Sequence, residues 1–256
     1  MNIEHSEMIS FGAGVNSVAM TIMLVNDGWR GPIVFADPGA EHPDTYCYLD
    51  YFEREWLRPR GLEVTRISPL THPELYRSDY LMTLIEKCKH RRMIPLMFTR
   101  WCTAEYKRDP LAKWAAANEV RTQLIGIAHE ESHRARFDVR YGIVKEYPLV
   151  DDRVNRAQCK VIIEAEGLAV PPKSGCWLCP FQTLAEWRAL YDLRPDLFAE
   201  AVSLEQAAHK RAGRLIKLAE GAGYSVLQLQ RQWDAQLELP LMPDPEYEYQ
   251  MCECRL

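Results

Sequence analysis

Two cysteines in the second half of the chain have the spacing of a metal-binding or redox pair. Cys176 and Cys179 form a Cys-Xaa-Xaa-Cys sequence in a proline-rich segment. Thiolates at this spacing ligate zinc or iron–sulfur clusters, and four ligands complete the shell in either case. Cys102 and Cys159 lie upstream and are our candidates for the other two ligands. The spacing also leaves open a redox dithiol, or two buried thiols without a metal.

Basic side chains in the middle of the chain could bind an anion. Lys107 follows Cys102 in a segment rich in cations, and neighbouring positive charge favours a thiolate by lowering the pKa of the thiol. Arg134 follows an apolar segment at 122–128, where an arginine can clamp a phosphate or sulfate with two hydrogen bonds. We assign anion contacts to Lys107 and Arg134. The alternative is a charged helix start and a solvated loop.

A glycine-containing loop follows the first apolar run and could bind phosphate. Small residues there let the backbone approach a phosphate closely, and the helix that follows offers free N–H groups and the positive end of its dipole. A tight strand–helix turn without a ligand is the alternative, because a glycine turn alone is a weak signal. The residues concerned are Ser10, Phe11, Gly12, Ala13, Gly14, Asn16 and Ser17.

A second loop, with two carboxylates, follows the next apolar run. Asp37, Gly39 and Glu41 come directly after residues 33–36. Ligands of open α/β sheets bind beyond the carboxyl ends of the strands, where two acids suit the hydroxyls of an adenosine or a metal ion. The alternative is an Asp-Pro-Gly turn followed by a helix that Asp44 or Thr45 caps.

The framework for these residues is an alternation of strand and helix patterns. Such alternation predicts an α/β fold with a doubly wound, mostly parallel sheet. We divide the chain into a nucleotide-binding α/β domain over 1–150 and a mainly helical region with the paired cysteines over 151–256. Strands are expected at 8–11, 33–36, 64–67 and 122–128, and helices at 18–28, 44–57, 110–118, 154–166, 184–193 and 195–222.

Composition excludes several classes of protein. The chain has 256 residues, of which 47% are hydrophobic and 26% charged, as in ordinary globular proteins. Its net charge of −5 argues against a strongly basic protein but permits a local basic stripe. It contains no run of about 18 apolar residues and no signal-peptide pattern at its start, so we expect a cytoplasmic protein without a membrane segment. Its eight cysteines are then expected to stay reduced.

Several of these segments resemble, in order, the motifs of the phosphoadenosine-phosphosulfate (PAPS) reductase and ATP pyrophosphatase superfamily. Residues 12–17 are similar to the pyrophosphate loop Ser-Gly-Gly-Xaa-Asp-Ser, and residues 10–12 match the Ser-Phe-Gly loop of PAPS reductases. Residues 37–45 are similar to Asp-Thr-Gly-Xaa-Glu-Xaa-Pro-Glu-Thr. Residues 102–111 and 126–134 resemble the Cys-Thr…Lys…Pro-Leu and Gly-Ile…Glu-Ser…Arg elements.

The resemblance implies an adenine nucleotide alpha hydrolase-like fold with ATP or PAPS as the bound nucleotide. It adds Gly126 to the nucleotide-binding residues. It also implies a 4Fe–4S cluster, rather than zinc, on Cys102, Cys159, Cys176 and Cys179. Mg²⁺ is a further expected cofactor, although Asn16 replaces the Asp of the motif and so removes a carboxylate of the kind that Mg²⁺ prefers.

The resemblance leaves three activities open. The first is an ATP-dependent sulfurtransferase, which adenylates an acceptor such as tRNA or DNA and takes sulfur from a donor such as a cysteine desulfurase. In it, the basic helix around Trp187 would grip the nucleic acid, unless Trp187 packs in the core. The second is a thioredoxin-linked reductase that releases sulfite, with Cys254 as the nucleophile. The third is a nucleotide-binding module without turnover. An oligomer is compatible with all three.

Overall fold

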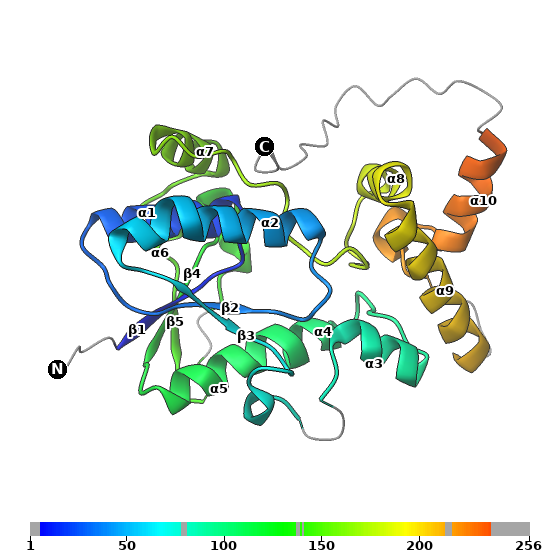
Figure 1. The fold of residues 1–256 in the computed structure, drawn as a ribbon, viewed down its shortest axis with the longest axis horizontal. Helices are drawn as coiled ribbons and strands as arrows, with labels where there is room; N and C mark the ends of the chain where they lie inside the picture. Colours follow the sequence, from blue (N-terminus) through cyan, green and yellow to red (C-terminus); the bar gives the residue numbers. More distant parts are fainter. Residues whose placement is uncertain (1–5, 78–80, 137–138, 140, 213–216, 237–256) are drawn as a thin grey trace.

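A five-stranded parallel sheet forms the centre of the protein (Figure 1). The computed structural model describes residues 6–77, 81–136, 139, 141–212 and 217–236. The strand order is β3-β2-β1-β4-β5, so the chain winds outward from β1 in both directions. Loops that leave the sheet at such a switch point diverge and open a crevice for ligands. The strands are β1 (Glu7–Ser10), β2 (Ile33–Ala36), β3 (Val64–Ile67), β4 (Thr122–Ile125) and β5 (Val144–Glu146).

Helices cover both faces of the sheet, which confirms the predicted doubly wound fold (Figure 1). The helices α1 (Val15–Asn26), α2 (Pro43–Phe52) and α7 (Arg156–Ala165) lie on one face. The helix α5 (Asp109–Ala117) lies on the other. Because α7 packs against α1, residues beyond 150 contribute to the same layer as the first strand–loop–helix unit.

Most element boundaries agree with the sequence patterns, and the differences have local causes. The strand predicted over 122–128 ends at Ile125, because the chain turns there with a hydrogen bond from Ile127 N to Ile125 O. The helix predicted over 44–57 changes after Phe52 into a π turn. The elements that the patterns missed include β5, α3 (Leu84–Arg91) and α10 (Val226–Gln236).

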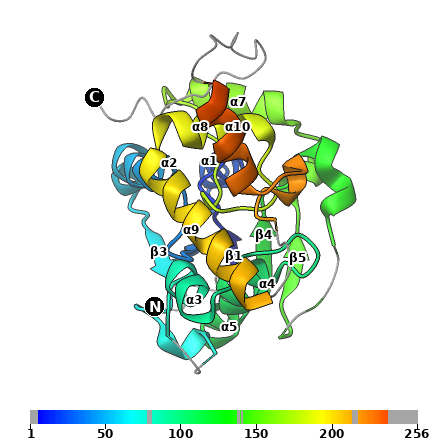
Figure 2. The same ribbon diagram turned by 90° about the vertical axis from the view of Figure 1, so that its right-hand side faces the viewer.

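Three helices after the paired cysteines form a separate layer at one end of the sheet (Figure 2). They are α8 (Leu184–Leu193), α9 (Pro195–Ala212) and α10. Trp187 is fully buried and packs edge to face against Phe198 at 6.4 Å, so it is a core residue rather than a nucleic-acid contact. No helix in the described ranges is both long enough and apolar enough to cross a membrane.

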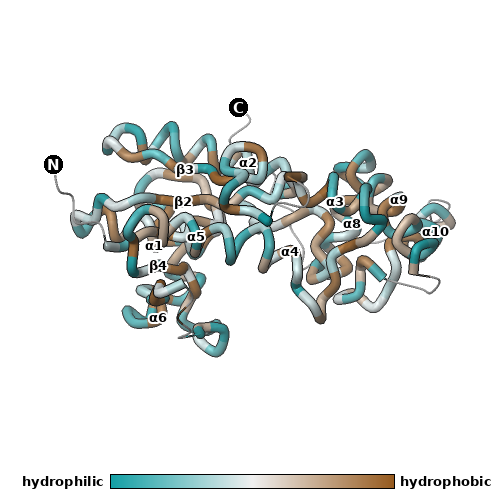
Figure 3. Tube along the Cα trace, turned by 90° about the horizontal axis from the view of Figure 1, so that it is seen from below, coloured by the Kyte–Doolittle hydropathy of each residue, from teal (hydrophilic) through white to brown (hydrophobic). Residues whose placement is uncertain are grey.

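The buried side chains form two groups on opposite sides of the sheet. Figure 3 colours the chain by hydropathy and shows hydrophobic residues at the central strand β2. One group joins the sheet to α1, α2 and α7 and includes Cys159. The other joins the sheet to α5, α3 and the C-terminal helices, and Cys102 and Cys176 pack against it. Cys159 therefore belongs to a different group of buried side chains from Cys102 and Cys176.

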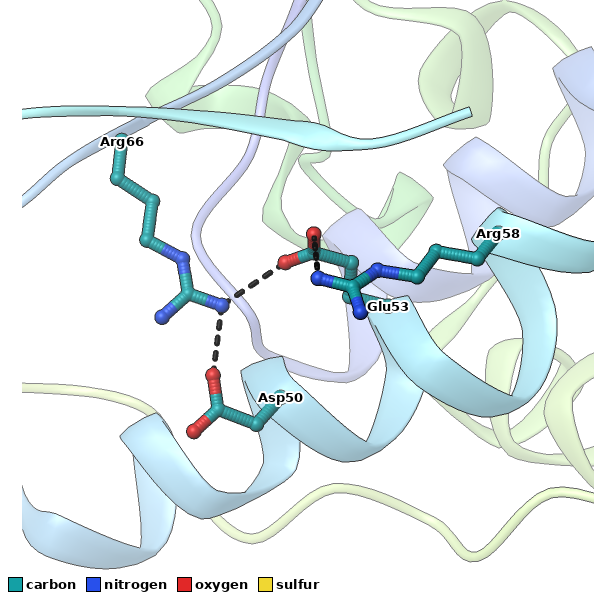
Figure 4. A network of polar contacts seen from close by, with 4 residues as sticks. All are labelled: Asp50, Glu53, Arg58 and Arg66. Carbon is teal, nitrogen blue, oxygen red and sulfur yellow. Dashed lines mark hydrogen bonds and ion pairs between the residues drawn. The ribbon is translucent and has the colours of Figure 1, made fainter. Parts of the chain in front are cut away.

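An ion-pair network fixes the end of α2 to the neighbouring strand (Figure 4). Arg66 of β3 donates to Asp50 at 2.6 Å and to Glu53 at 2.8 Å. Arg58 donates to the other oxygen of Glu53 at 3.2 Å. Because Glu53 is buried and both of its oxygens are used, it orients the helix that follows the second loop of the site.

Alanine at Gly126 is expected to destabilise the protein by roughly 1–3 kcal/mol, because its methyl group would overpack the start of α1. That methyl group would lie 2.8 Å from Ser17 Cα and 2.9 Å from the carbonyl carbon of Asn16. Gly12→Ala is the matched control, since its nearest neighbour would be Ser17 Oγ at 3.8 Å. Urea denaturation of both variants measures the difference. Equal stabilities would show that α1 can shift away from Gly126 at no cost.

Candidate functional site

The turn between β1 and α1 keeps the backbone of a glycine loop although one of its glycines is replaced. Ala13 is buried with φ at 53°, a left-handed conformation that costs a non-glycine residue roughly 1–2 kcal/mol. Gly14 precedes the helix, and its N–H donates to Ser17 Oγ at 3.2 Å. The first amides of α1 have no intrahelical partner, which suits them to an anion. The predicted residues Ser10, Phe11, Gly12, Ala13, Gly14, Asn16 and Ser17 therefore lie along this one turn.

The segment before the paired cysteines lies directly over this turn. A methyl group added at Gly14 would lie 2.5 Å from Ser174 Oγ and 3.4 Å from Ser174 Cβ. The lack of a side chain at Gly14 therefore leaves space for Ser174, in addition to any space needed for the predicted phosphate.

Alanine at Gly14 is expected to lower stability mainly through its clash with Ser174. In the double variant Gly14→Ala/Ser174→Gly the clash is relieved, so the cost of the alanine should fall to within about 0.5 kcal/mol of zero, as for non-interacting sites. Thermal denaturation of the four proteins in the cycle measures this, and calorimetric ATP binding in the Ser174→Gly background then reports on the phosphate contact alone. An alanine that is equally harmful in both backgrounds would assign the need for glycine to something other than Ser174.

The loop after β2 is held in shape by Asp37. Its Oδ1 accepts hydrogen bonds from Gly39 N at 2.7 Å and from Tyr46 Oη at 2.6 Å. Burial and the Asp37 carboxylate raise the pKa of Tyr46 above its ordinary value, so the hydroxyl stays a donor. Gly39 has φ at 68°. The helix cap that the alternative placed at Asp44 or Thr45 is at His42 instead, because the ring of His42 accepts from Asp44 N.

Glu41 is the most buried charge of the site. It pairs with Lys107, and Cys176 Sγ donates to the same oxygen, Glu41 Oε1, at 3.7 Å. Burial lowers the pKa of Lys107, but the charges of Glu41 and Cys176 outweigh burial and raise it above its ordinary value. The second oxygen, Glu41 Oε2, is buried and has no hydrogen-bond partner within the described residues. A buried carboxylate oxygen without a partner is rare in folded proteins, and a donor from a ligand would satisfy it.

Backbone hydrogen bonds join the second loop to the Cys-Xaa-Xaa-Cys segment. Glu41 and Cys176 form an antiparallel β-bridge, flanked by a bond from His42 N to Gly175 O at 2.9 Å and one from Trp177 N to Ala40 O at 3.1 Å. The two loops that the sequence analysis treated as separate sites are thus one structure.

Three of the four predicted metal ligands come together beside this pair. Burial and the charge of Cys102 both raise the pKa of Cys176 and of Cys179, while Lys107 lowers it. Cys179 N donates to Cys176 O at 3.0 Å, so the pair forms a tight turn. Burial also raises the pKa of Cys102. The thiols of Cys102, Cys176 and Cys179 therefore lie within each other's electrostatic reach.

The fourth predicted ligand, Cys159, packs in the other group of buried side chains. It is fully buried on α7, in the group around α1. Burial and then Glu130 raise its pKa to about 11. Cys102 also acts on Cys88 of α3, whose pKa burial and Cys102 raise to about 12. Within the described part of the chain, no three His, Cys, Asp or Glu side chains are arranged to hold a metal ion.

Polar contacts connect Arg134 to the glycine turn. The Arg134 guanidinium pairs with Glu131, whose other oxygen accepts from Asn16 Nδ2 at 3.3 Å. Arg156 Nη1 donates to Asn16 Oδ1 at 3.4 Å. The Arg134 side chain is 55% exposed, so it is an accessible cation rather than a buried clamp. Two arginines, of which only Arg134 was predicted, thus border the turn.

A cavity of about 280 Å³ lies between α1, α7 and the cysteine loop. Its lining includes Val15 at the start of α1, Arg156, Ser174, Cys176 and Cys179. It therefore connects the glycine turn with the thiols.

Besides Arg156, three residues of this site were missed by the sequence analysis. Ser174 lies in a Pro-Pro-Lys-Ser-Gly segment whose rigidity was recognised but whose contact with Gly14 was not. Glu131 lies within a recognised motif, but only its neighbour Arg134 was chosen. Cys88 reaches Cys102 through the packing of α3, for which the local sequence gives no signal.

Fold and site together define a doubly wound α/β protein with its glycine turn, buried ion pair and thiols at the carboxyl ends of the strands. No family model matches the sequence, and no curated protein matches it. The structure is similar to that of a PAPS reductase from Candida auris in complex with phosphate, with a TM-score of 0.46 and 19% identity, over 66% of this chain and 81% of that one. It is also similar to the U34-tRNA thiolase NcsA from Methanococcus maripaludis with its 4Fe–4S cluster, with a TM-score of 0.46 and 13% identity, over 96% of this chain and 80% of that one. At these values the function must be argued from the chain's own residues.

Proposed function

We propose that the protein is an ATP-using sulfur-transfer enzyme. The observation that carries this proposal is the meeting of three thiols, Cys102, Cys176 and Cys179, with the Lys107–Glu41 pair next to the two strand-end loops. Sulfur chemistry and phosphate-type chemistry then share one site. A nucleotide-binding module without turnover would not need thiols beside this ion pair.

In the proposed reaction, an acceptor oxygen attacks the α-phosphorus of ATP and pyrophosphate leaves. A sulfur donor then adds to the adenylated acceptor and AMP leaves. The glycine turn supports this proposal because Ala13 keeps a strained left-handed conformation, and such strain persists mainly where a functional backbone geometry is needed. The amides at the start of α1 would bind the leaving phosphates, and Arg134 would neutralise their charge.

The two members of the ion pair, Glu41 and Lys107, have separate roles in this proposal. Lys107 stays protonated because its pKa is raised, and it would stabilise negative charge on a phosphate or on a thiolate. Glu41 holds Lys107 in place with one oxygen and presents its unpartnered oxygen to a ribose hydroxyl of the nucleotide.

The described cysteines do not complete the predicted cluster shell. Cys102, Cys176 and Cys179 would hold an iron–sulfur cluster, which when bound would carry or position sulfur, whereas Cys159 packs in the group of buried side chains around α1. The reaction steps above therefore depend on none of its chemistry. Cys252 and Cys254, the next sequence candidates, lie outside the described residues.

One assay separates the proposed activity from its alternatives. The protein, purified anaerobically, is incubated with ATP or with PAPS, each with and without a cysteine desulfurase, cysteine and bulk tRNA. Pyrophosphate and AMP from ATP, with sulfur in the tRNA, are the expected products. Sulfite from PAPS in the presence of thioredoxin would instead establish the reductase. Binding of either nucleotide without any product would leave only a nucleotide-binding module.

A further inference from the structure

A second and larger cavity lies away from the glycine turn. It has a volume of about 760 Å³, within the range of roughly 300–1,000 Å³ that small-molecule sites occupy. It is enclosed by α3, the segment from Met93 to Tyr106, the start of α5 and the end of α9. Figure 2 shows α3 beside the lower end of α9. The proposed reaction uses none of the side chains that line it.

The lining is basic although the protein as a whole is acidic. Six cationic side chains line the cavity against two acidic ones, Glu105 and Asp109, whereas the chain has a net charge of −5. Such a local concentration of one charge in an oppositely charged protein marks a site for an anion. The six are Arg77, Lys87, Arg91, Arg92, Lys113 and Arg211.

Several of these cations contact acceptor groups of the protein, whereas two of them are left to contact a ligand. Lys113 Nζ donates to Leu75 O at 2.9 Å, and Lys87 pairs with Glu105. The Arg77 and Arg92 side chains are exposed and make no hydrogen bond or ion pair with any other described side chain or carbonyl. Arg92 lies in a left-handed turn, with φ at 47°, directly after α3. The cavity therefore presents unneutralised guanidinium groups over a rigid floor.

Aromatic side chains stand among the cations. Trp101 is partly buried, and the Lys87 ammonium lies 5.2 Å from the centre of its ring. Tyr141 lines the same cavity with 54% of its surface exposed. Positive charge interleaved with aromatic faces suits an unpaired nucleotide, since phosphates contact the cations and bases stack on the rings. A free phosphate or sulfate ion has no base that could stack on the aromatic side chains.

The cavity shares one wall with the thiol site. The segment from Trp101 to Lys107 presents Trp101, Glu105 and Tyr106 to the cavity, and Cys102 and Lys107 to the site of the other cysteines. A nucleic-acid strand bound in the cavity would thus be separated from the thiols by this one segment.

We infer that this cavity, which we call the basic pocket, binds a nucleotide unit of single-stranded nucleic acid. The inference rests on the proposed function only in one respect, namely that the bound strand would be the acceptor of sulfur. Arg77 and Arg92 contact its phosphates, and Tyr141 and Trp101 stack on its bases.

Binding of fluorescent single-stranded RNA and DNA oligonucleotides, followed by anisotropy over a range of salt concentrations, tests the basic pocket. The variant Arg77→Glu/Arg92→Glu should bind at least tenfold more weakly. Its plot of log affinity against log salt should be shallower by about 1.4, for two lost phosphate contacts at about 0.7 each. The control Arg121→Glu/Arg231→Glu changes the net charge equally at two exposed arginines outside the pocket and should bind as the wild type does.

Two further measurements decide the nature of the ligand. Inorganic tripolyphosphate should compete with the oligonucleotide at least tenfold more weakly than an unlabelled oligonucleotide of the same charge, because it has no bases to stack. An oligonucleotide with 5-iodouracil should crosslink to Tyr141 or Trp101. Equal losses in the two charge variants, equal competition by tripolyphosphate, or crosslinks only elsewhere would each overturn the inference. Oligonucleotide binding with these properties in a protein that releases no pyrophosphate would keep the basic pocket and remove the proposed reaction.

Discussion

Replacement of Lys107 by methionine is expected to lower the free energy of unfolding by about 2 kcal/mol, because it leaves the Glu41 carboxylate buried without its cation. The Glu41 side chain is only 1% exposed, whereas that of Lys107 is 38% exposed. Loss of one partner from a fully buried pair costs roughly 3–5 kcal/mol, and water that reaches the Lys107 end reduces this cost. Urea denaturation followed by circular dichroism measures the change.

A double-variant cycle shows whether the buried charge is the cause. Glutamine at Glu41 keeps the shape of the side chain without its charge, so Glu41→Gln/Lys107→Met should be more stable than Lys107→Met alone, by about 1 kcal/mol. Lys173→Met is the matched control, because Lys173 also pairs with a glutamate, Glu186, but is 60% exposed. Its cost should be below about 1 kcal/mol. A Lys107→Met variant as stable as Lys173→Met would contradict the buried pair.

Serine at Cys176 or Cys179 is expected to abolish sulfur transfer and remove bound iron and sulfide, whereas serine at Cys159 should leave both. The reason is placement: Cys176 and Cys179 lie with Cys102 beside Lys107, and Cys159 lies in the core around α1. Anaerobically purified wild type should be brown, with about four iron and four sulfide per chain if the cluster is of the 4Fe–4S type. Metal analysis of each variant measures the change.

Two controls test whether the loss of iron is specific to the thiols of the site. Cys47→Ser changes a thiol outside the thiol site and should retain all iron. Cys159→Ser buries a hydroxyl in an apolar core and should cost some stability, so iron is counted per folded protein, as measured by circular dichroism. Colourless protein with stoichiometric zinc would retain the thiol site and contradict the iron–sulfur cluster. Loss of iron in Cys159→Ser would contradict the placement itself.

Elements with a strong local pattern were predictable from the sequence. The strand at 33–36 is a short apolar run, the strand at 64–67 has apolar residues at both ends, and the helix over 184–193 begins at a capping box on Thr183 and Glu186. By contrast, β5 was missed because Val-Lys-Glu is short, largely charged and has no apolar run.

The same limit explains the parts of the site that were missed. Motif spacing identified Glu41 and Cys176, but not that a β-bridge joins them across more than a hundred residues. Spacing also favoured Cys159 as a ligand, because nothing in the local sequence indicates which side of a sheet a helix covers. In this chain α7 packs on the same face of the sheet as α1, and the packing of the whole domain determines this placement.

The β-bridge between the two loops has a thermodynamic consequence. A ligand that fixes residues 40–42 also fixes residues 175–177, since the two backbone hydrogen bonds of the β-bridge hold the two segments to each other. If nucleotide at the first segment changes the affinity of the second for metal or sulfur by some factor, the second must change nucleotide affinity by the same factor. The binding of sulfur and the binding of ATP are then linked equilibria, so the affinity for each depends on whether the other is bound.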